Sequence, residues 1–407
     1  MNRIILYDKL KDCCACGACM NICPVQAIHM QPDQNGFLYP VIDETLCIKC
    51  EKCKQVCAFQ KKIYSSSLKE TYVAVTQSVN VLESASGGLF ASFAKAVLDV
   101  GGVVYGCAMF YEEGKLFPKH ICVSKPENLI LLKGSKYVQS DIGYIYRDVQ
   151  DKLKKGNIVL FSGTPCQVAG LNGFLQRKYE NLYTLDIICH GVPSIQFFQD
   201  YIDYTEKKIG KKIVGFQFRN KSKGWKLFGK ILCENEDGIL ETRYFEPEES
   251  SYYQMFLNSY TYRENCYSCP YACDNRQGDI TIGDYWCVEL VHPELISENG
   301  GPLEHENGTS CMIINNIHGQ EMLRRFGDGI EKWSSAYENA AKYNGQLKVP
   351  SMMKPEREKV FTLYKEGYEK IEKWYQRRLL PIKIRRKIVR MIPKPIKQTI
   401  KMIICRR

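Results

Sequence analysis

Two runs of cysteine lie within the first sixty residues and share one spacing. The first is Cys13-x2-Cys16-x2-Cys19-x3-Cys23, and the second is Cys47-x2-Cys50-x2-Cys53-x3-Cys57. Three cysteines two residues apart wrap a loop around one corner of a cuboidal iron-sulfur cluster, whereas the fourth lies too far along to reach that cluster and binds the other one. The spacing therefore predicts two 4Fe-4S clusters, one held by Cys13, Cys16, Cys19 and Cys57, the other by Cys47, Cys50, Cys53 and Cys23.

Residues 8–60 resemble the two-cluster bacterial ferredoxins. Pro24 follows the first run as in that family, but Ala58 stands where the family usually has a proline after the last cysteine. A pair of zinc sites remains the alternative, because eight cysteines in two interleaved groups also supply four ligands to each of two zinc ions. Cys14 is surplus to both schemes.

The chain has 20 cysteines in 407 residues. The N-terminus lacks the apolar stretch and cleavage site of a signal peptide, and no apolar run approaches the roughly 18 residues that a membrane span needs. We therefore expect a cytoplasmic protein. Cytosolic thiols stay reduced, so such a cysteine count points to metal binding and not to disulfides.

The order of predicted elements indicates a mixed fold after a polar, Ser-rich link at 61–70. Strands are expected at 71–76, 103–109, 157–162 and 182–188, alternating with helices at 89–100, 144–155 and 165–178. This rhythm predicts an α/β domain with a mostly parallel sheet. Strands at 214–219, 226–233 and 240–245 are expected to form an antiparallel meander, and 278–286 one further strand. The fold class is thus α+β or α/β, with a ferredoxin-like module before a mixed α/β domain.

Two further cysteines directly follow buried strands. Cys166 comes after the strand at 157–162 and Cys189 after the one at 182–188. The carboxyl ends of parallel strands are where open α/β sheets place their sites. Thr164 and Pro165 are typical of a helix start, which puts Cys166 in a first helical turn where the dipole favours a thiolate. With the later Cys266-x2-Cys269, four thiolates could form a third metal site; buried structural cysteines are the alternative.

Four motifs carry a resemblance to a known family. SGTPCQVAGL, DIICHGVPS, YRENCYSCPYA and RQGDITIGDYW follow in this order, and residues 70–345 resemble the coenzyme F-420 hydrogenase/dehydrogenase beta-subunit family. That resemblance implies an oxidoreductase domain with FAD and one 4Fe-4S cluster, whose ligands are expected to be Cys166, Cys189, Cys266 and Cys269. Cys273 lies outside the pattern.

The expected flavin contacts come from three segments. Ser86, Gly87 and Gly88 lie between a strand and a helix, where glycines let backbone N–H groups approach a phosphate at the helix N-terminus. An ordinary glycine turn is the alternative, and the resemblance favours the flavin. It also implies flavin contacts by Lys136, Tyr137, Gln139 and Ser140, and by Thr164 and Gln167 beside a cluster ligand. His190 is either a flavin or substrate contact or a structural histidine.

The C-terminal residues 377–407 contain 12 Lys and Arg and no Asp or Glu. Since the net charge of the chain is +11, the rest is about neutral (11 − 12 = −1). Interleaved Ile, Leu, Val and Met make the segment amphipathic, which favours peripheral contact with the anionic inner membrane face. A disordered tail or a partner-docking arm is the alternative, and the lack of aromatic residues disfavours nucleic acid. Its prolines, including Pro381, predict short helical pieces.

Together these features predict four parts: a two-cluster ferredoxin module at 1–62, a FAD and 4Fe-4S domain at 70–345, a helical linker at 346–376 and the basic tail at 377–407. We expect an oxidoreductase that passes electrons between a redox carrier or partner oxidoreductase, FAD and an unidentified small-molecule substrate. The alternative is a non-catalytic electron-transfer subunit that feeds a partner enzyme.

Overall fold

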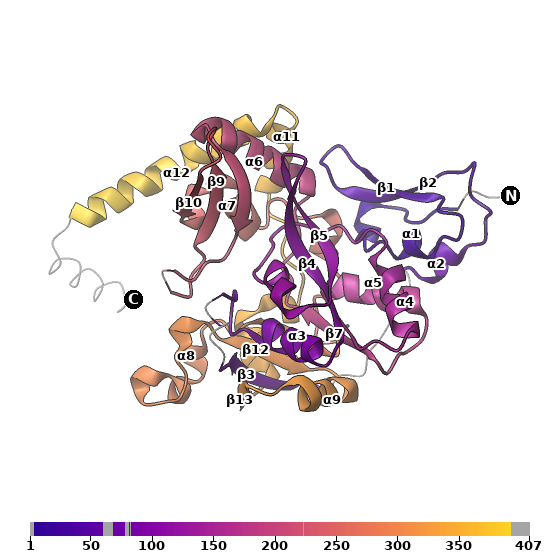
Figure 1. Ribbon diagram of the computed structural model, residues 1–407. Coiled ribbons are helices and arrows are strands. Elements are labelled where there is room, and N and C mark those ends of the chain that lie inside the picture. Colours follow the sequence, from indigo (N-terminus) through magenta and orange to yellow (C-terminus); the bar gives the residue numbers. More distant parts are fainter. Residues whose placement is uncertain (1–3, 60–67, 78–80, 82, 223, 392–407) are drawn as a thin grey trace.

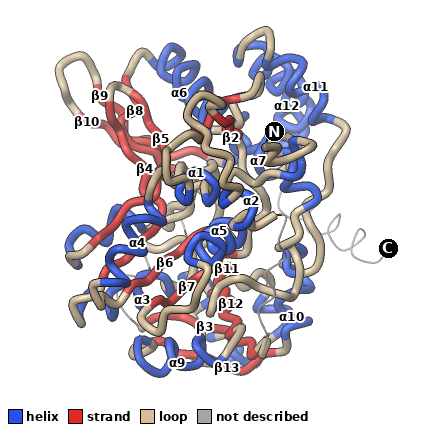
Figure 2. Tube along the Cα trace, turned by 90° about the vertical axis from the view of Figure 1, so that its right-hand side faces the viewer, coloured by secondary structure: helices blue, strands red, loops and turns tan. Residues whose placement is uncertain are grey.

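The computed structural model describes residues 4–59, 68–77, 81, 83–222 and 224–391, with side chains placed up to residue 380. Its centre is an eight-stranded sheet (Figures 1 and 2). In spatial order the strands are β13 (Ile330–Ser335), β3 (Glu70–Thr76), β12 (Ser310–Ile314), β11 (Ile280–Asp284), β7 (Leu182–Ile187), β6 (Val159–Gly163), β4 (Val103–Glu112) and β5 (Lys115–Val123).

The sheet is parallel only at its centre. Strands β4, β6, β7 and β11 run parallel, whereas β12, β3, β13 and β5 join by antiparallel pairing. The prediction of a mostly parallel sheet was therefore wrong at both edges. β5 returns from β4 as a hairpin through Glu113 and Gly114, both at positive φ. β12 and β13 come from segments for which no strand was predicted.

Alternating side chains of the central strands bury both faces of the sheet. Val104 and Leu160 face one layer, formed by α3 (Leu89–Asp99) and α9 (Ile317–Phe326). Tyr105 and Phe161 face the other, formed by α4 (Ile145–Lys154) and α5 (Pro165–Leu175). α10 (Tyr337–Tyr343) packs with β3 and β12. This sandwich holds the carboxyl ends of β6 and β7 in fixed positions.

The N-terminal module packs on the outer side of α4 and α5 (Figure 1). It comprises the hairpin β1 (Ile28–Pro32) and β2 (Leu38–Ile42) and the short helices α1 (Ala18–Ile22) and α2 (Lys52–Gln55). Ala18, Val56 and Ala58 share one apolar core with residues of α4 and α5. The module is therefore built into the main domain.

A second, three-stranded antiparallel sheet confirms the predicted meander, with the order β10 (Leu240–Phe245), β9 (Gly229–Glu234) and β8 (Lys212–Gln217). Helices α6 (Ile195–Ile209), α7 (Ser251–Leu257), α11 (Glu356–Tyr364) and α12 (Tyr368–Met391) cover it. The short α8 (Val288–Val291) follows β11.

Helix α12 corrects two expectations about the C-terminus. It crosses the predicted boundary at 376 and 377, because Tyr368, Ile371, Tyr375 and Leu379 form an apolar stripe that packs against α6 and β8. The predicted linker is thus part of the core. The helix also continues through Pro381, where a break was expected; a proline removes one backbone hydrogen bond, and here the helix tolerates that loss. Residues 392–407 lie outside the described part of the chain.

Candidate functional site

A cavity of about 420 Å³ opens at the carboxyl ends of β6 and β7. Its size falls in the range of small-molecule sites. The lining includes the four main-domain cysteines of the predicted third cluster, together with every predicted flavin residue except Gly87: Ser86, Gly88, Lys136, Tyr137, Gln139, Ser140, Thr164 and Gln167. One cavity therefore joins the two sets of residues that the sequence separated.

Four cysteines from three segments meet on one wall of this cavity. Cys166 lies in the first turn of α5, after Thr164, whose backbone N–H donates to Gln167 Oε1 at 2.9 Å. Cys189 follows β7, and Cys266 and Cys269 lie at the 3-10 turn Glu264–Ser268. Each of the six pairs among the four thiols is close enough to act on the pKa of a member. The structure thus brings the predicted set together.

Burial makes these thiols hard to ionise. It raises the pKa of Cys189 and of Cys269 to about 12 and that of Cys266 well above its usual value. Cys166 differs, because a hydrogen bond with Cys14 lowers its pKa to about 7. A metal centre would displace the protons of all four thiols and compensate their charge. The donor set is therefore all sulfur, partly buried and convergent, which fits an iron-sulfur cluster.

The N-terminal cysteines group as their spacing predicts. Cys57 acts on the pKa of both Cys13 and Cys19, so it lies with the first run. Cys23 and Cys53 share a small buried core, and Cys47 packs against it. Cys50, by contrast, is exposed. The last cysteine of each run thus lies with the other run.

Within the described residues, no group of three or more His, Cys, Asp or Glu side chains has the arrangement of a site for a single metal ion. A cuboidal cluster contains four iron and four sulfide ions, so its thiolates lie further apart than the ligands of one zinc ion. Each cysteine group supplies four thiols, which is the number of protein ligands that such a cluster takes.

The surplus Cys14 lies between two predicted clusters. It is buried, and its thiol lies against those of Cys16 and Cys166. Gly170, one turn after Cys166 on α5, makes this approach possible: a Cβ there would lie 2.7 Å from Cys16 Cβ and 2.9 Å from Tyr146 Oη. The first cysteine run therefore packs directly on the helix that begins at Cys166.

The glycine loop before α3 owes its sequence partly to packing. A Cβ on Gly87 would lie 2.6 Å from the Ala74 carbonyl oxygen, and Gly88 has a φ of 84° as the N-cap of α3. Gly87 is therefore required by the close approach of another backbone segment, and Gly88 by its own left-handed conformation. Ser86 and Gly88 nevertheless line the cavity at the N-terminus of α3, where free N–H groups favour an anion.

Two basic residues that sequence reasoning missed hold this loop. Lys221 Nζ donates to the carbonyl oxygens of Ser86 at 2.5 Å and of Val81 and Asn307 at 2.6 Å each. Arg219 donates to the Ala85 carbonyl oxygen at 3.1 Å and pairs with Asp284 at 2.9 Å. Burial, and then the Arg219 charge, lower the pKa of Lys221 to about 8. The loop thus has a positive environment behind it.

The predicted stretch 136–140 also lines the cavity. Lys136 Nζ donates to the Lys133 and Leu132 carbonyl oxygens at 2.7 and 2.9 Å, and burial lowers its pKa to about 8. Tyr137 stacks on Phe256, with 4.3 Å between ring centroids. Lys136 is therefore a partly buried cation held by backbone carbonyl oxygens, and Tyr137 a fixed aromatic surface.

A hydrogen-bonded chain joins the remaining predicted residues. Gln167 Nε2 donates to Ser140 Oγ at 2.9 Å, and Ser140 lies 2.9 Å from His120 Nδ1. His120 Nε2 lies 3.1 Å from the Ser162 carbonyl oxygen, which can only accept, so the proton sits on Nε2. Burial lowers the pKa of His120 to about 4. The chain fixes Gln167 beside Cys166.

His190 and Cys273 differ in their relation to the site. His190 lines the cavity, its carbonyl oxygen accepts from Ser351 Oγ at 2.6 Å, and burial lowers the pKa of its imidazole. The Cys273 thiol donates to the Pro270 carbonyl oxygen at 3.3 Å and lies outside the lining. Cys273 is therefore tied to its own loop.

Comparisons with known proteins agree with this arrangement. Residues 156–332 match the family model for the C terminus of the coenzyme F420 hydrogenase/dehydrogenase beta subunit. Residues 12–61 match a 4Fe-4S dicluster domain, which supports 4Fe-4S binding by the module. The family resemblance is confirmed. Over these two ranges the chain is thus similar to an oxidoreductase-type subunit domain and to an iron-sulfur module.

A search of curated proteins found no match. Among solved structures, a chain of the F420-reducing [NiFe] hydrogenase complex from Methanosarcina barkeri aligns with a TM-score of 0.39 and 17% identity, covering 77% of this chain and 92% of that chain. No helix in the described part of the chain is long and apolar enough to cross a membrane.

Proposed function

We propose that the protein is a flavin-dependent iron-sulfur oxidoreductase with FAD in the 420 Å³ cavity and three 4Fe-4S clusters. The observation that carries this proposal is the shared cavity, since the four main-domain cysteines and the glycine loop line one space. When bound, the clusters supply single-electron steps and the flavin couples two of them to the chemistry of a small-molecule substrate.

The groups proposed to hold the flavin come from separate segments that line the cavity. The N-terminus of α3 offers free N–H groups to the phosphates, and Lys221 and Arg219 place positive charge behind the loop at 84–88. Tyr137 and Phe256 offer an aromatic wall to the ring system. Thr164 and Gln167 are hydrogen-bonded to each other, and Thr164 also contacts Cys166. The cavity is therefore lined by these two residues directly beside a proposed cluster ligand.

The cysteine groups support an ordered path through the chain. Cys50 is exposed, so its group faces a redox carrier. Behind it lies the other group of the module, formed by Cys13, Cys16, Cys19 and Cys57. Cys19 of this group lies close to Cys53 of the exposed group, so the two groups are neighbours. Cys16 and Cys166 then meet through Cys14. The module is thus placed to exchange electrons with the cavity in the main domain.

Replacing Lys221 by methionine tests the flavin site. Loss of charge-assisted hydrogen bonds worth about 1.5–3 kcal/mol should weaken flavin binding about 10- to 100-fold. Iron content should stay unchanged, because Lys221 touches no cysteine. Lys226→Met is the matched control, since Lys226 is exposed on the same segment. Unchanged flavin content in Lys221→Met would place the cofactor elsewhere.

A non-catalytic electron-transfer subunit is the second candidate, favoured by the description of the matching family model as part of a beta subunit. Such a subunit would copurify with a larger oxidoreductase and show no substrate turnover alone. Turnover by the isolated, flavin-loaded chain with a small-molecule acceptor would exclude this candidate.

A further inference from the structure

Four arginines are buried in the described part of the chain: Arg219, Arg263, Arg276 and Arg357. Three of them have a carboxylate partner, namely Asp284 for Arg219, Asp186 for Arg276 and Glu264 for Arg357. Arg263 is 0% exposed and forms no ion pair with any carboxylate that the structure describes. A buried charge without a counter-ion costs several kcal/mol. Arg263 therefore needs another source of negative charge.

The guanidinium of Arg263 joins the main domain to the N-terminal module. Its Nε donates to the Cys13 carbonyl oxygen at 3.0 Å and an Nη to that of Leu38 at 2.7 Å. The other Nη donates to Gln139 Oε1 at 3.3 Å, and Gln139 in turn donates to the Cys14 carbonyl oxygen at 3.3 Å. All these partners are neutral, so hydrogen bonding is satisfied while the charge is not.

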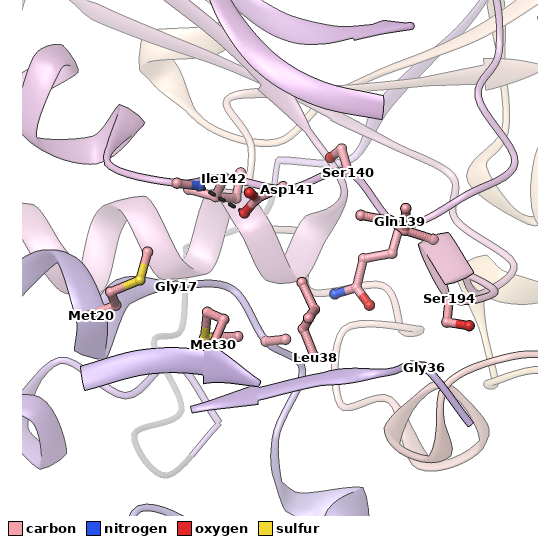
Figure 3. Close-up of a pocket in the computed structure, with 13 residues that line it drawn as sticks. Gly17, Met20, Met30, Gly36, Leu38, Gln139, Ser140, Asp141, Ile142 and Ser194 are labelled. Carbon is pink, nitrogen blue, oxygen red and sulfur yellow. Dashed lines mark hydrogen bonds between the residues drawn. The ribbon is translucent and has the colours of Figure 1, made fainter. Parts of the chain in front are cut away.

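The close-up in Figure 3 shows this boundary. Gln139 extends from the main domain towards Leu38 of the module. The gap beside them has a volume of only about 20 Å³, room for roughly one water molecule. Arg263 itself borders the 420 Å³ cavity but is 0% exposed, so bulk water does not contact its guanidinium. The face of Tyr39, 3.9 Å from the guanidinium carbon, covers another side.

Arg263 lies beside two different cysteine groups. The 3.0 Å hydrogen bond from Arg263 Nε to the Cys13 carbonyl oxygen places the guanidinium beside the first cysteine run. On the other side, the Arg263 carbonyl oxygen accepts from the Cys266 backbone N–H at 3.0 Å, and Arg263 lines the same cavity as Cys166. Cys13 belongs to the module and Cys166 to the main domain. The cation thus lies between the two groups.

We propose that Arg263 is the counter-charge shared by the cluster of Cys13, Cys16, Cys19 and Cys57 and the cluster of Cys166, Cys189, Cys266 and Cys269, and that it raises the reduction potentials of both. The inference rests on the proposed function. Adding one electron from a one-electron carrier breaks no bond and adds one negative charge, which a fixed cation in a dry environment stabilises. Arg263 thereby makes the step between module and main domain favourable.

The test is a potentiometric titration of the anaerobic full-length protein, with the clusters followed by electron paramagnetic resonance. In Arg263→Gln the ratio of reduced to oxidised cluster at a fixed potential should fall at least about tenfold, which is about 59 mV for a one-electron couple. Arg263→Lys keeps the charge and should stay within about threefold of the wild type, or about 28 mV. Arg357→Gln removes a buried arginine that has its own carboxylate and should also leave the potentials in place.

The variant Gln139→Glu is a second test of whether the charge of Arg263 sets the reduction potentials. It places a carboxylate at the position 3.3 Å from the Arg263 Nη and neutralises the cation without removing it. The potentials should again fall. This variant decides the question if Arg263→Gln does not fold.

Unchanged potentials in an iron-replete Arg263→Gln or Gln139→Glu protein would overturn this inference alone. Equal shifts in Arg263→Lys and Arg263→Gln would assign the arginine a purely structural role and overturn it as well. A wild-type protein without cluster signals would instead overturn the proposed function, and this inference with it.

Discussion

Replacing Gly170 by alanine tests how closely the N-terminal module packs on α5. The new methyl group would lie 2.7 Å from Cys16 Cβ, 2.9 Å from Cys16 Sγ and 2.9 Å from Tyr146 Oη. Tyr146 cannot easily yield, because its hydroxyl donates to the Gln167 carbonyl oxygen at 2.8 Å and its ring is buried. The loop that carries Cys16 must therefore move.

The expected cost combines two opposing effects. Overpacking a core costs about 1–3 kcal/mol, and replacing glycine by alanine within a helix returns about 1 kcal/mol. With three atoms closer than 3.0 Å, we expect the net cost near the upper end, at about 1–2 kcal/mol. For a chain of 407 residues, with an unfolding entropy of about 2.1 cal/mol/K per residue, a loss of that size lowers the melting temperature by about 1–2 °C.

The assay is anaerobic thermal unfolding followed by the visible absorbance of the clusters, at one fixed scan rate. Gly345→Ala is the matched control, since a Cβ there meets nothing within 4 Å. It should melt at or slightly above the wild-type temperature. If Gly170→Ala melts with the wild type and holds the same iron, the module does not pack on α5 as described.

Three further outcomes follow from the site and the tail. Cys266→Ser should lower the iron content by about four per chain and leave the module's signals intact, as measured by iron analysis and electron paramagnetic resonance; loss of all iron would contradict separate clusters. The pKa of His120 is lowered to about 4, so the folded state binds fewer protons than the unfolded state between about pH 4 and 6.5; stability should fall as pH falls through that window, and His120→Gln should melt with less pH dependence. Deleting 381–407, which spares the apolar stripe of α12, should abolish salt-sensitive flotation with anionic liposomes; a full-length protein that ignores such liposomes at low salt would refute membrane contact.

Sequence reasoning succeeded where local spacing or strand polarity decides geometry. The exchange of Cys23 and Cys57 between runs follows from the reach of a few residues of chain, and the structure groups them so. Cys166 and Cys189 end neighbouring parallel strands, so their meeting follows from the pairing of β6 with β7. The start of α5 at Thr164 and Pro165 was likewise predictable from capping chemistry.

The rest depends on contacts between distant segments. Lys221 and Arg219 reach a loop more than 130 residues earlier in the chain, and Arg263 reaches Cys13 and Leu38 across more than 220 residues. Nothing in the local sequence marks such long-range hydrogen bonds. The basic residue in YRENCYSCPYA, three positions before a cluster ligand, was the one available signal for Arg263. The helix propensity of proline alone predicts that α12 ends at Pro381. The packing of its apolar stripe, which the sequence does not show, stabilises the helix that continues through this residue.

We propose that one chain holds three iron-sulfur clusters and a flavin. Quantification of iron, acid-labile sulfide and released flavin, per chain of anaerobically purified full-length protein, tests it most directly. We predict about twelve irons, about twelve sulfides and about one FAD. Zinc at about two per chain without acid-labile sulfide, or full iron without flavin, would contradict the account.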